Sequence, residues 1–412
     1  MHDNSAEQFA TQVVKRLSDA GYVALFAGGC VRDKLLSVEP KDYDVATSAR
    51  PEEVRELFGR RRTIAVGQSF GVITILGPKP HQIEVATFRS DGAYTDGRRP
   101  DSVIYSSPEE DALRRDFTIN GMFYDPLKSQ LIDFVDGQRD LEARCIRAIG
   151  NAADRIEEDR LRMLRAARFA ATYDFQIEPE TLQAVQERAA KITSVSQERT
   201  THELQRMLVH SNRAGALNLL RETLLLEHVL PCLQPLATDE TAWSRLMRIV
   251  ESLNQPTFPL VLSALFGSDG VDLKKQELAA VGRKLKLSND HRKSMQWIAR
   301  SLPTLAKANE LSYSEVQPLL VCEWTGDALG LLEAVTRENQ TNPEALQFCR
   351  EKLKLPSDTL NPAPLIGGQD LAEMGLTPGP AFAEHITRVR NAQLNGQITN
   401  RDEAIELVRK HM

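Results

Sequence analysis

The sequence is poor in the features that mark membrane, secreted and zinc-binding proteins. None of its apolar runs approaches the roughly 20 residues that a membrane-spanning helix needs. Its 5 cysteines are widely spaced and form no CxxC pair, so neither a disulfide framework nor a zinc knuckle is expected. Residues 1–5 have neither the basic start nor the apolar stretch of a signal peptide. We therefore expect a cytoplasmic protein that does not contact a membrane.

A surplus of positive charge is also missing. The 51 Lys and Arg residues are outnumbered by 57 Asp and Glu, for a formal net charge of -6. Proteins that bind nucleic acid without sequence preference usually carry a basic surplus, so any RNA binding has to use a local basic surface. The 412 residues are 42% hydrophobic, which is ordinary globular usage and corresponds to roughly two to four domains.

The pattern of apolar residues changes near residue 150. Before it, strand-like runs alternate with helical spacing. We expect strands at 22–27, 43–47, 63–66, 70–76, 82–88 and 131–135, and helices at 5–20, 31–36, 51–58 and 109–120. The polar segment 90–100 is typical of a long loop. From residue 154 onward apolar residues recur every three or four positions, which predicts an α+β head followed by helices.

Two glycines, Gly28 and Gly29, separate a predicted strand from a predicted helix. Because glycine has no Cβ, the backbone there can approach a phosphate closely, and the free N–H groups of the new helix favour an anion. Arg32 lies one turn into the helix and could add a charge-assisted contact. The segment is a candidate phosphate-binding turn, although an isolated pair of glycines is most often structural.

A pair of carboxylates, Asp42 and Asp44, follows on a predicted strand. Residues i and i+2 of a strand point to the same side, so both can reach one Mg²⁺ ion. Glu84 is an acid in an otherwise apolar strand and could complete a two-metal site, or it could be an edge residue facing water. Each signal is weak alone, but their order is that of a site for a nucleoside triphosphate and a metal.

Two further charged clusters lie downstream. Arg114, Arg115 and Asp116, followed by Asn120, could bind phosphate or ribose hydroxyls, or could form a solvated helix face.

The second cluster contains Asp159 and Arg162, which on one helix would be neighbours at i and i+3. One offers hydrogen-bond acceptors and the other donors, so the couple could pair with the edge of a nucleobase. The alternative is an ordinary intrahelical ion pair.

Taken in this order, the clusters resemble the motifs of class II CCA-adding tRNA nucleotidyltransferases and the related bacterial poly(A) polymerases. The resemblance covers nearly the whole chain and lies in residues 28–44, 114–122, 133–141, 158–162 and 196–204. This chain departs from the usual pattern at Cys30, Gly121, Arg160 and Thr200, none of which removes a charged group.

The resemblance implies an α+β fold with a head like that of DNA polymerase β and an all-α neck, body and tail. The implied domains are a palm-like catalytic head at 1–150, a base- and RNA-binding neck at 151–230, a body at 231–355 and a tRNA-binding tail at 356–412. By resemblance, Asp42, Asp44 and Glu84 are catalytic, and the first two bind Mg²⁺. The implied nucleotide-binding residues are Gly28, Gly29, Arg32, Arg114, Arg115, Asp116, Asn120, Asp159, Arg162, Arg165 and Arg168.

The activity implied is addition of CCA, from CTP and ATP, to the 3′ end of tRNA, whose acceptor arm the helices would hold. Segment 91–100 resembles a flexible element that CC-adding members lack, but an A-adding enzyme working beside a CC-adding partner would keep it. A poly(A) polymerase is a further alternative, although the strongly basic C-terminal extension common among them is missing. Outside the family, a catalytically silent RNA-binding protein and a nucleotidyltransferase for small molecules or proteins stay open. The sequence leaves open the oligomeric state, the tRNA-contacting residues and the change from C to A.

Overall fold

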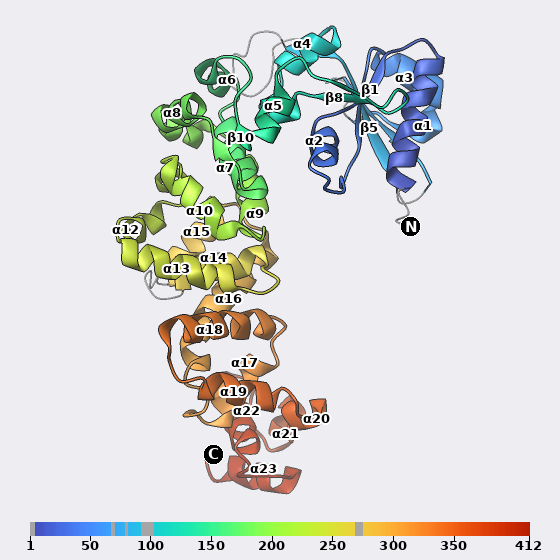
Figure 1. The fold of residues 1–412 in the computed structure, drawn as a ribbon. Coiled ribbons are helices and arrows are strands. Elements are labelled where there is room, and N and C mark those ends of the chain that lie inside the picture. Colours follow the sequence, from blue (N-terminus) through green and yellow to red (C-terminus); the bar gives the residue numbers. More distant parts are fainter. Residues whose placement is uncertain (1–4, 67–70, 79–80, 92–102, 268–274) are drawn as a thin grey trace. The chain divides into compact units, whose positions relative to one another are not determined.

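The computed structural model of the chain describes residues 5–66, 71–78, 81–91, 103–267 and 275–412 (Figure 1). The chain divides into two compact units. The first comprises Met1–Met207 with Gly215–Pro231, and the second comprises Leu208–Ala214 with Cys232–Met412. In the described part of the chain, no helix is both long and apolar enough to cross a bilayer.

The first unit is built on a seven-stranded sheet of order β3-β4-β5-β2-β1-β8-β9. Strands β2 and β5 pair in parallel, whereas their neighbours pair antiparallel. The strands are β1 (Ala24–Ala27), β2 (Asp44–Thr47), β3 (Thr63–Ile64), β4 (Val72–Leu76), β5 (Gln82–Thr87), β8 (Phe123–Asp125) and β9 (Gln130–Ile132). β6 (Arg89–Asp91) and β7 (Val103–Tyr105) form a separate antiparallel pair, and most of the loop predicted at 90–100 lies outside the described residues.

Helices cover this sheet with their apolar faces. They are α1 (Ser5–Asp19), α2 (Gly29–Leu35), α3 (Pro51–Phe58) and α4 (Pro108–Leu113). α5 (Gly137–Glu142) instead packs on residues 118–120 and 145–146. The face of α1 that carries Val13, Val14 and Leu17 is buried, and α1 packs on β1 and β2. Alternating burial along β5, with Ile83 and Val85 inside and Glu84 outside, fixes which side chains of that strand reach the solvent.

The helix predicted at 109–120 is wrong beyond Leu113, where α4 ends. Phe117 adopts an extended conformation and bridges to Ala148, and a 3₁₀ helix, η3 (Thr118–Asn120), follows. Burial of Phe117 against Phe169 outweighs the local helical pattern, because an aromatic core contact stabilises more than helix propensity does. Strand β8, which the sequence analysis did not predict, comes directly after this turn.

Helices dominate the rest of the first unit. They are α6 (Ala152–Glu158), α7 (Arg162–Tyr173), α8 (Pro179–Arg188), α9 (Gln197–Leu208), α10 (Arg213–Glu222) and α11 (Leu226–Val229), with 3₁₀ helices η4 (Ala189–Ser194) and η5 (Pro231–Leu233). The last residue of α9, the first two residues of α10 and the last two of η5 belong to the second unit. A short parallel pair, β10 (Cys145–Ile146) with β11 (Gln176–Ile177), is a detail that the sequence analysis did not predict. The predicted α+β head followed by helices is confirmed, whereas the boundaries at 150, 230 and 355 stay predictions.

The second unit is helical throughout its described residues. Its elements are α12 (Gln234–Ala237), α13 (Glu240–Ser252), α14 (Phe258–Gly267), α15 (Lys275–Lys284), α16 (Asn289–Leu305), α17 (Tyr313–Leu320), α18 (Thr325–Asn339), α19 (Glu344–Lys352), α20 (Ser357–Leu360), α21 (Gly368–Glu373), α22 (Pro380–Leu394) and α23 (Arg401–Arg409). α14 is apolar on every side and is buried among α13, α16 and α18. A separate cluster holds α21, α22 and α23 together.

Arg213 fastens the end of α13. Its side chain is 4% exposed and donates to the carbonyl oxygens of Val250 at 2.7 Å, Glu251 at 2.7 Å and Leu253 at 2.5 Å. The last carbonyls of a helix have no partner within the helix, so these bonds satisfy groups that would otherwise be buried unpaired.

We expect Arg213→Ala to lower the free energy of unfolding by about 2–3 kcal/mol, because three backbone carbonyls at the end of α13 lose a charged donor that is itself buried. The matched control is Arg248→Ala, which changes an arginine of α13 itself. The Arg248 side chain is 58% exposed and pairs with Glu338, so its loss should matter by under about 1 kcal/mol. Urea unfolding of both variants tests this, and equal midpoints for the two would contradict it.

Candidate active site

The register of β2 and β5 brings two of the predicted catalytic acids together. Asp44 and Glu84 are direct partners across this parallel pair. Neighbouring strands lie about 4.8 Å apart, so the two side chains leave the same face side by side. Asp42 precedes the strand by two residues, and all three acids are exposed.

The other two carboxylates act on Asp44. The surrounding protein removes part of the water around the Asp44 carboxylate, and this desolvation raises its pKa to about 6. The negative charges of Glu84 and Asp42 add to the rise in pKa, whereas the positive charge of Arg115 opposes it. Among the described residues, however, no three His, Cys, Asp or Glu side chains are gathered closely enough to hold a metal ion. The pairing of β2 with β5 in the interior of the sheet therefore brings the predicted acids together without closing them into a ligand cage.

The glycine turn lies beneath two guanidinium groups. Gly28 has φ +73°, a conformation that favours glycine, and α2 begins at the next residue. A Cβ on Gly28 would lie 3.1 Å from Nη1 of Arg115, and a Cβ on Gly29 would lie 3.4 Å from Nη2 of Arg32. Because the glycines leave this space open, positive charge lies directly over the turn. The turn and its two arginines suit a polyphosphate chain.

A hydrogen-bonded network joins α2, η3 and α7. The Arg32 guanidinium donates to the side-chain oxygen of Asn120, and Asn120 Nδ2 donates to Asp116 Oδ1 at 3.1 Å. Arg165 Nε then donates to Asp116 Oδ2 at 2.7 Å. Burial alone would raise the pKa of Asp116, but the charge of Arg165 and the hydrogen bonds from Asn120 and Arg165 hold it at about 2. Four of the predicted nucleotide-binding residues are thus joined in one buried array.

The remaining predicted arginines are also held by carboxylates. Arg114 and Arg115 both donate to Asp111, at 2.7 Å and 2.9 Å, and Asp111 is 1% exposed. Arg168 is 4% exposed and donates to Glu203, with Phe169 against its guanidinium. In this structure Arg168 is therefore enclosed within the protein and does not present its charge to the solvent.

Asp159 and Arg162 do not lie on one helix, so the predicted i, i+3 couple is wrong as a local structure. α6 ends at Glu158, Asp159 is extended with φ -144° and ψ 101°, and α7 begins at Arg162. Arg162 Nη1 bonds with Glu158 Oε2 at 2.8 Å. Asp159 is paired with Arg199 at 2.7 Å, so the alternative of an ion pair between Asp159 and Arg162 is wrong as well.

Several residues of the site were not identified from the sequence. Asp111, Glu203 and Arg199 each hold a predicted nucleotide-binding residue, and Arg155 donates to the backbone carbonyls of Arg114 and Arg115. The spacing of three and four residues between Asp111 and the two arginines is a local signal that could have revealed it. The others are at least 35 residues from their partners in sequence. Arg199 and Glu203 fall in the segment 196–204 that carries part of the family resemblance, but no spacing predicts which residue each of them contacts.

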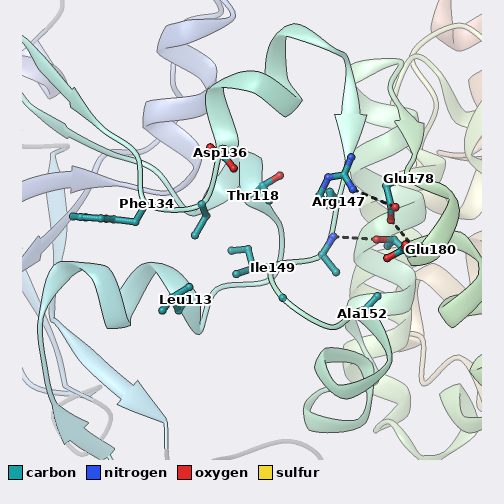
Figure 2. A pocket seen from close by; sticks show the side chains of 13 residues that line it. Leu113, Thr118, Phe134, Asp136, Arg147, Ile149, Ala152, Glu178 and Glu180 are labelled. Carbon is teal, nitrogen blue, oxygen red and sulfur yellow. Dashed lines mark hydrogen bonds and ion pairs between the residues drawn. The ribbon is translucent and has the colours of Figure 1, made fainter.

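A cavity of about 230 Å³ lies next to η3 but contains none of the predicted site residues. Figure 2 shows Arg147 pointing toward Glu178 in its wall, with Leu113 and Phe134 on the apolar side. Thr118 lines this cavity and donates to Asp140 at 2.7 Å. The hydrogen bond from Thr118 to Asp140 thus holds η3 in addition to the network of Asp116 and Asn120.

Family models match three parts of the chain. Residues 24–147 match "Poly A polymerase head domain", 174–236 match "Probable RNA and SrmB- binding site of polymerase A", and 266–408 match "tRNA nucleotidyltransferase domain 2 putative". The first match spans the sheet, the glycine turn and the three predicted catalytic acids Asp42, Asp44 and Glu84. The fold and the site together are those of a nucleotidyltransferase with a poly(A) polymerase type of head.

Relatives match over nearly the full length. The CCA-adding enzyme of Enterococcus faecalis is 33% identical over 96% of this chain and 94% of its own, and that of Limosilactobacillus fermentum is 33% identical over 95% and 93%. The crystal structure of the Bacillus stearothermophilus CCA-adding enzyme in complex with CTP is 29% identical, covers 98% of this chain and 97% of its own, and has a TM-score of 0.78. The chain belongs to the family of CCA-adding enzymes.

We expect Gly28→Ala to weaken ATP binding roughly tenfold, because its Cβ displaces Arg115 from the turn and costs a charge-assisted contact. Gly59→Ala is the matched control. Gly59 has a similar φ of +85° with nothing within 4 Å of its Cβ position, so its substitution adds only backbone strain of about 1–3 kcal/mol. Titration calorimetry with ATP distinguishes them, and the same affinity in both variants would show that Arg115 does not act through this turn.

Proposed function

We propose that this chain adds the CCA end to tRNA by transferring CMP and AMP onto its 3′-hydroxyl group. The observation that carries the proposal is the pairing of Asp44 with Glu84 beside the glycine turn and Arg115. The full-length similarity to CCA-adding enzymes favours CCA addition over the A-adding and poly(A)-forming alternatives. The scarcity of cysteine suits a reducing cytoplasm, where we propose that the enzyme acts.

The family is generally dependent on divalent metal ions, and we propose Mg²⁺ as the ion that Asp42 and Asp44 hold. The acids fit a cation, because the pKa of Asp44 is raised first by loss of water around it and then by the negative charge of Glu84, which a cation would offset. Carboxylate oxygens are the ligands that Mg²⁺ prefers. When bound, the ion would lower the pKa of the attacking hydroxyl and neutralise charge on the leaving pyrophosphate.

The side chains then divide the remaining work. The 3′ oxygen of the RNA forms a bond with the α-phosphorus, the bond from that phosphorus to the bridging oxygen breaks, and pyrophosphate leaves. We assign the removal of the proton of the 3′-hydroxyl group to Glu84, because this acid is the direct neighbour of Asp44 across β2 and β5. Gly28, Arg32 and Arg115 bind the triphosphate, and the array of Asp116 and Asn120 orients the ribose.

Base selection falls to Asp159 and Arg162. An ionised carboxylate only accepts hydrogen bonds and a guanidinium only donates them. Cytosine and adenine both carry an amino group that donates, whereas uracil and guanine place a carbonyl oxygen at the equivalent position. A carbonyl oxygen facing Asp159 cannot donate a hydrogen bond, so the base oxygen and the Asp159 carboxylate would both stay unpaired. UTP and GTP are therefore rejected.

We expect wild-type protein, given tRNA that lacks its end, to add C residues from CTP alone and to complete the end when ATP is also present. Asp42→Ala should reduce the rate at least about 100-fold, since it removes a metal ligand. Asp19→Ala, which changes an exposed acid paired with Lys15, is the control. Incorporation of labelled nucleotides measures this.

The alternatives give different products in the same assay. Addition of AMP to tRNA ending in CC without any use of CTP would identify an A-adding enzyme. Long A tails on arbitrary RNA would identify a poly(A) polymerase. RNA binding without transfer of any nucleotide would leave a catalytically silent RNA-binding protein.

The contribution of Asp44 to the stability of the metal-free protein should fall as pH rises from 4 to 6. Folded Asp44 keeps its proton up to about pH 6, whereas an unperturbed Asp has a pKa of 3.8, so at this residue the folded state binds more protons in this window. We therefore expect Asp44→Asn to be more stable than wild type at pH 7 and similar to it below pH 4. Added Mg²⁺ should stabilise wild type alone.

Thermal unfolding with and without Mg²⁺ measures these differences. Asp19→Asn should show none of them, because Asp19 is exposed and has Lys15 as a partner. A metal-free wild type that is more stable than Asp44→Asn at pH 7 would contradict the prediction.

A further inference from the structure

Asp159 is held by a partner that comes from a different helix. Arg199, in the first turn of α9, donates from Nη2 to Oδ2 of Asp159 at 2.7 Å and from Nη1 to Oδ1 at 3.2 Å. The two side chains are 26% and 18% exposed, so the pair lies largely inside the protein. The backbone N–H of Leu161 also donates to Oδ1, at 3.1 Å. This two-point contact fixes both the position and the rotation of the carboxylate.

The hydrogen bonds leave Asp159 with little spare capacity. An ionised carboxylate can accept about four hydrogen bonds, two at each oxygen. Oδ1 already accepts two, from Arg199 and Leu161, and Oδ2 accepts one from Arg199. One acceptor position therefore remains, and it is on Oδ2.

We infer that Arg199 is a specificity-determining positioning residue, which aims the remaining acceptor of Asp159 at the amino group of cytosine or adenine. This inference rests on the proposed function. A single fixed acceptor matches a single N–H group on a base edge. A base that presents a carbonyl oxygen there meets a carboxylate oxygen that cannot turn away, so the mismatch is not relieved by rotation.

Arg199 acts on Asp159 and not on the other base-reading group. Arg162 is held separately by Glu158 Oε2 at 2.8 Å and by the carbonyl oxygens of Arg155 at 2.8 Å and Arg114 at 3.2 Å. Loss of Arg199 therefore frees the carboxylate while the donor side of the pair keeps its own supports.

The neighbouring Arg160 provides a matched control. It fastens the same junction between α6 and α7, with Nη1 donating to Ser194 Oγ at 2.7 Å and Nη2 lying 3.5 Å from Glu157 Oε2. None of its hydrogen bonds in the described structure involves the Asp159 carboxylate. It thus shares the structural role of Arg199 without the proposed effect on base choice.

The test compares kcat/KM for CTP and UTP in wild type, Arg199→Met, Arg199→Lys and Arg160→Met. We expect the preference for CTP to fall roughly tenfold or more in Arg199→Met, the effect of losing one well-aimed charged hydrogen bond. Arg199→Lys should recover part of it, because an ammonium group can hold one oxygen of the carboxylate but not both in a planar fork. Arg160→Met should keep the wild-type preference within about twofold.

An unchanged preference in Arg199→Met would overturn the inference, even if its thermal midpoint fell as in Arg160→Met, because the residue would then be merely structural. Equilibrium binding of CTP and UTP to the same four proteins gives the preference without any transfer. A wild type that binds CTP selectively but transfers no nucleotide would overturn the proposed function while the binding ratios still decide the role of Arg199.

Discussion

The parallel pairing of β2 with β5 is the constraint on which the rest of the site depends. It sets Asp44 opposite Glu84 on a solvent-facing part of the sheet, an arrangement that is unfavourable for two like charges. Removal of water around Asp44 is the main cause of its raised pKa, and the repulsion from Glu84 adds to it. Two neighbouring negative charges lower the stability of the folded protein at this point. A cation bound there during the reaction would offset their repulsion. Since every other strand pair around it is antiparallel, this one crossover decides where the acids meet.

Around the paired acids Asp44 and Glu84, the protein holds its charged side chains with partners of the opposite charge. Asp111 holds Arg115, Asp116 joins Asn120 to Arg165, and the two-point contact of Arg199 fixes Asp159. Groups whose positions are fixed before the substrate arrives lose little freedom when it binds, which favours both rate and selectivity. The site is therefore better understood as a set of guanidinium–carboxylate contacts between helices than as a list of independent ligands.

Much of this arrangement follows from the sequence, because its signals are local. The alternation of apolar residues gives the strands that carry Asp44 and Glu84, Pro51 marks the start of α3, and the glycine pair marks the turn. Long-range packing accounts for what the sequence analysis missed. Phe117 leaves the helical pattern to fill a core position, and Asp159 leaves the helix because Arg199, 40 residues later, holds it. No spacing rule reports a contact over such a separation, so these corrections required three-dimensional coordinates.

The buried ion pair of Arg168 and Glu203 limits which substitutions the two positions can accept during evolution. Each charge is almost fully removed from water. Arg165 also lies 3.9 Å from Glu203, but Arg168 is its closer partner, so replacing Arg168 or Glu203 alone leaves the other with much less charge compensation in a poorly solvating interior. A path from this pair to an apolar pair has to pass through an intermediate that folds badly. The two positions, one on α7 and one on α9, are therefore locked to each other, and lineages that change one should change both.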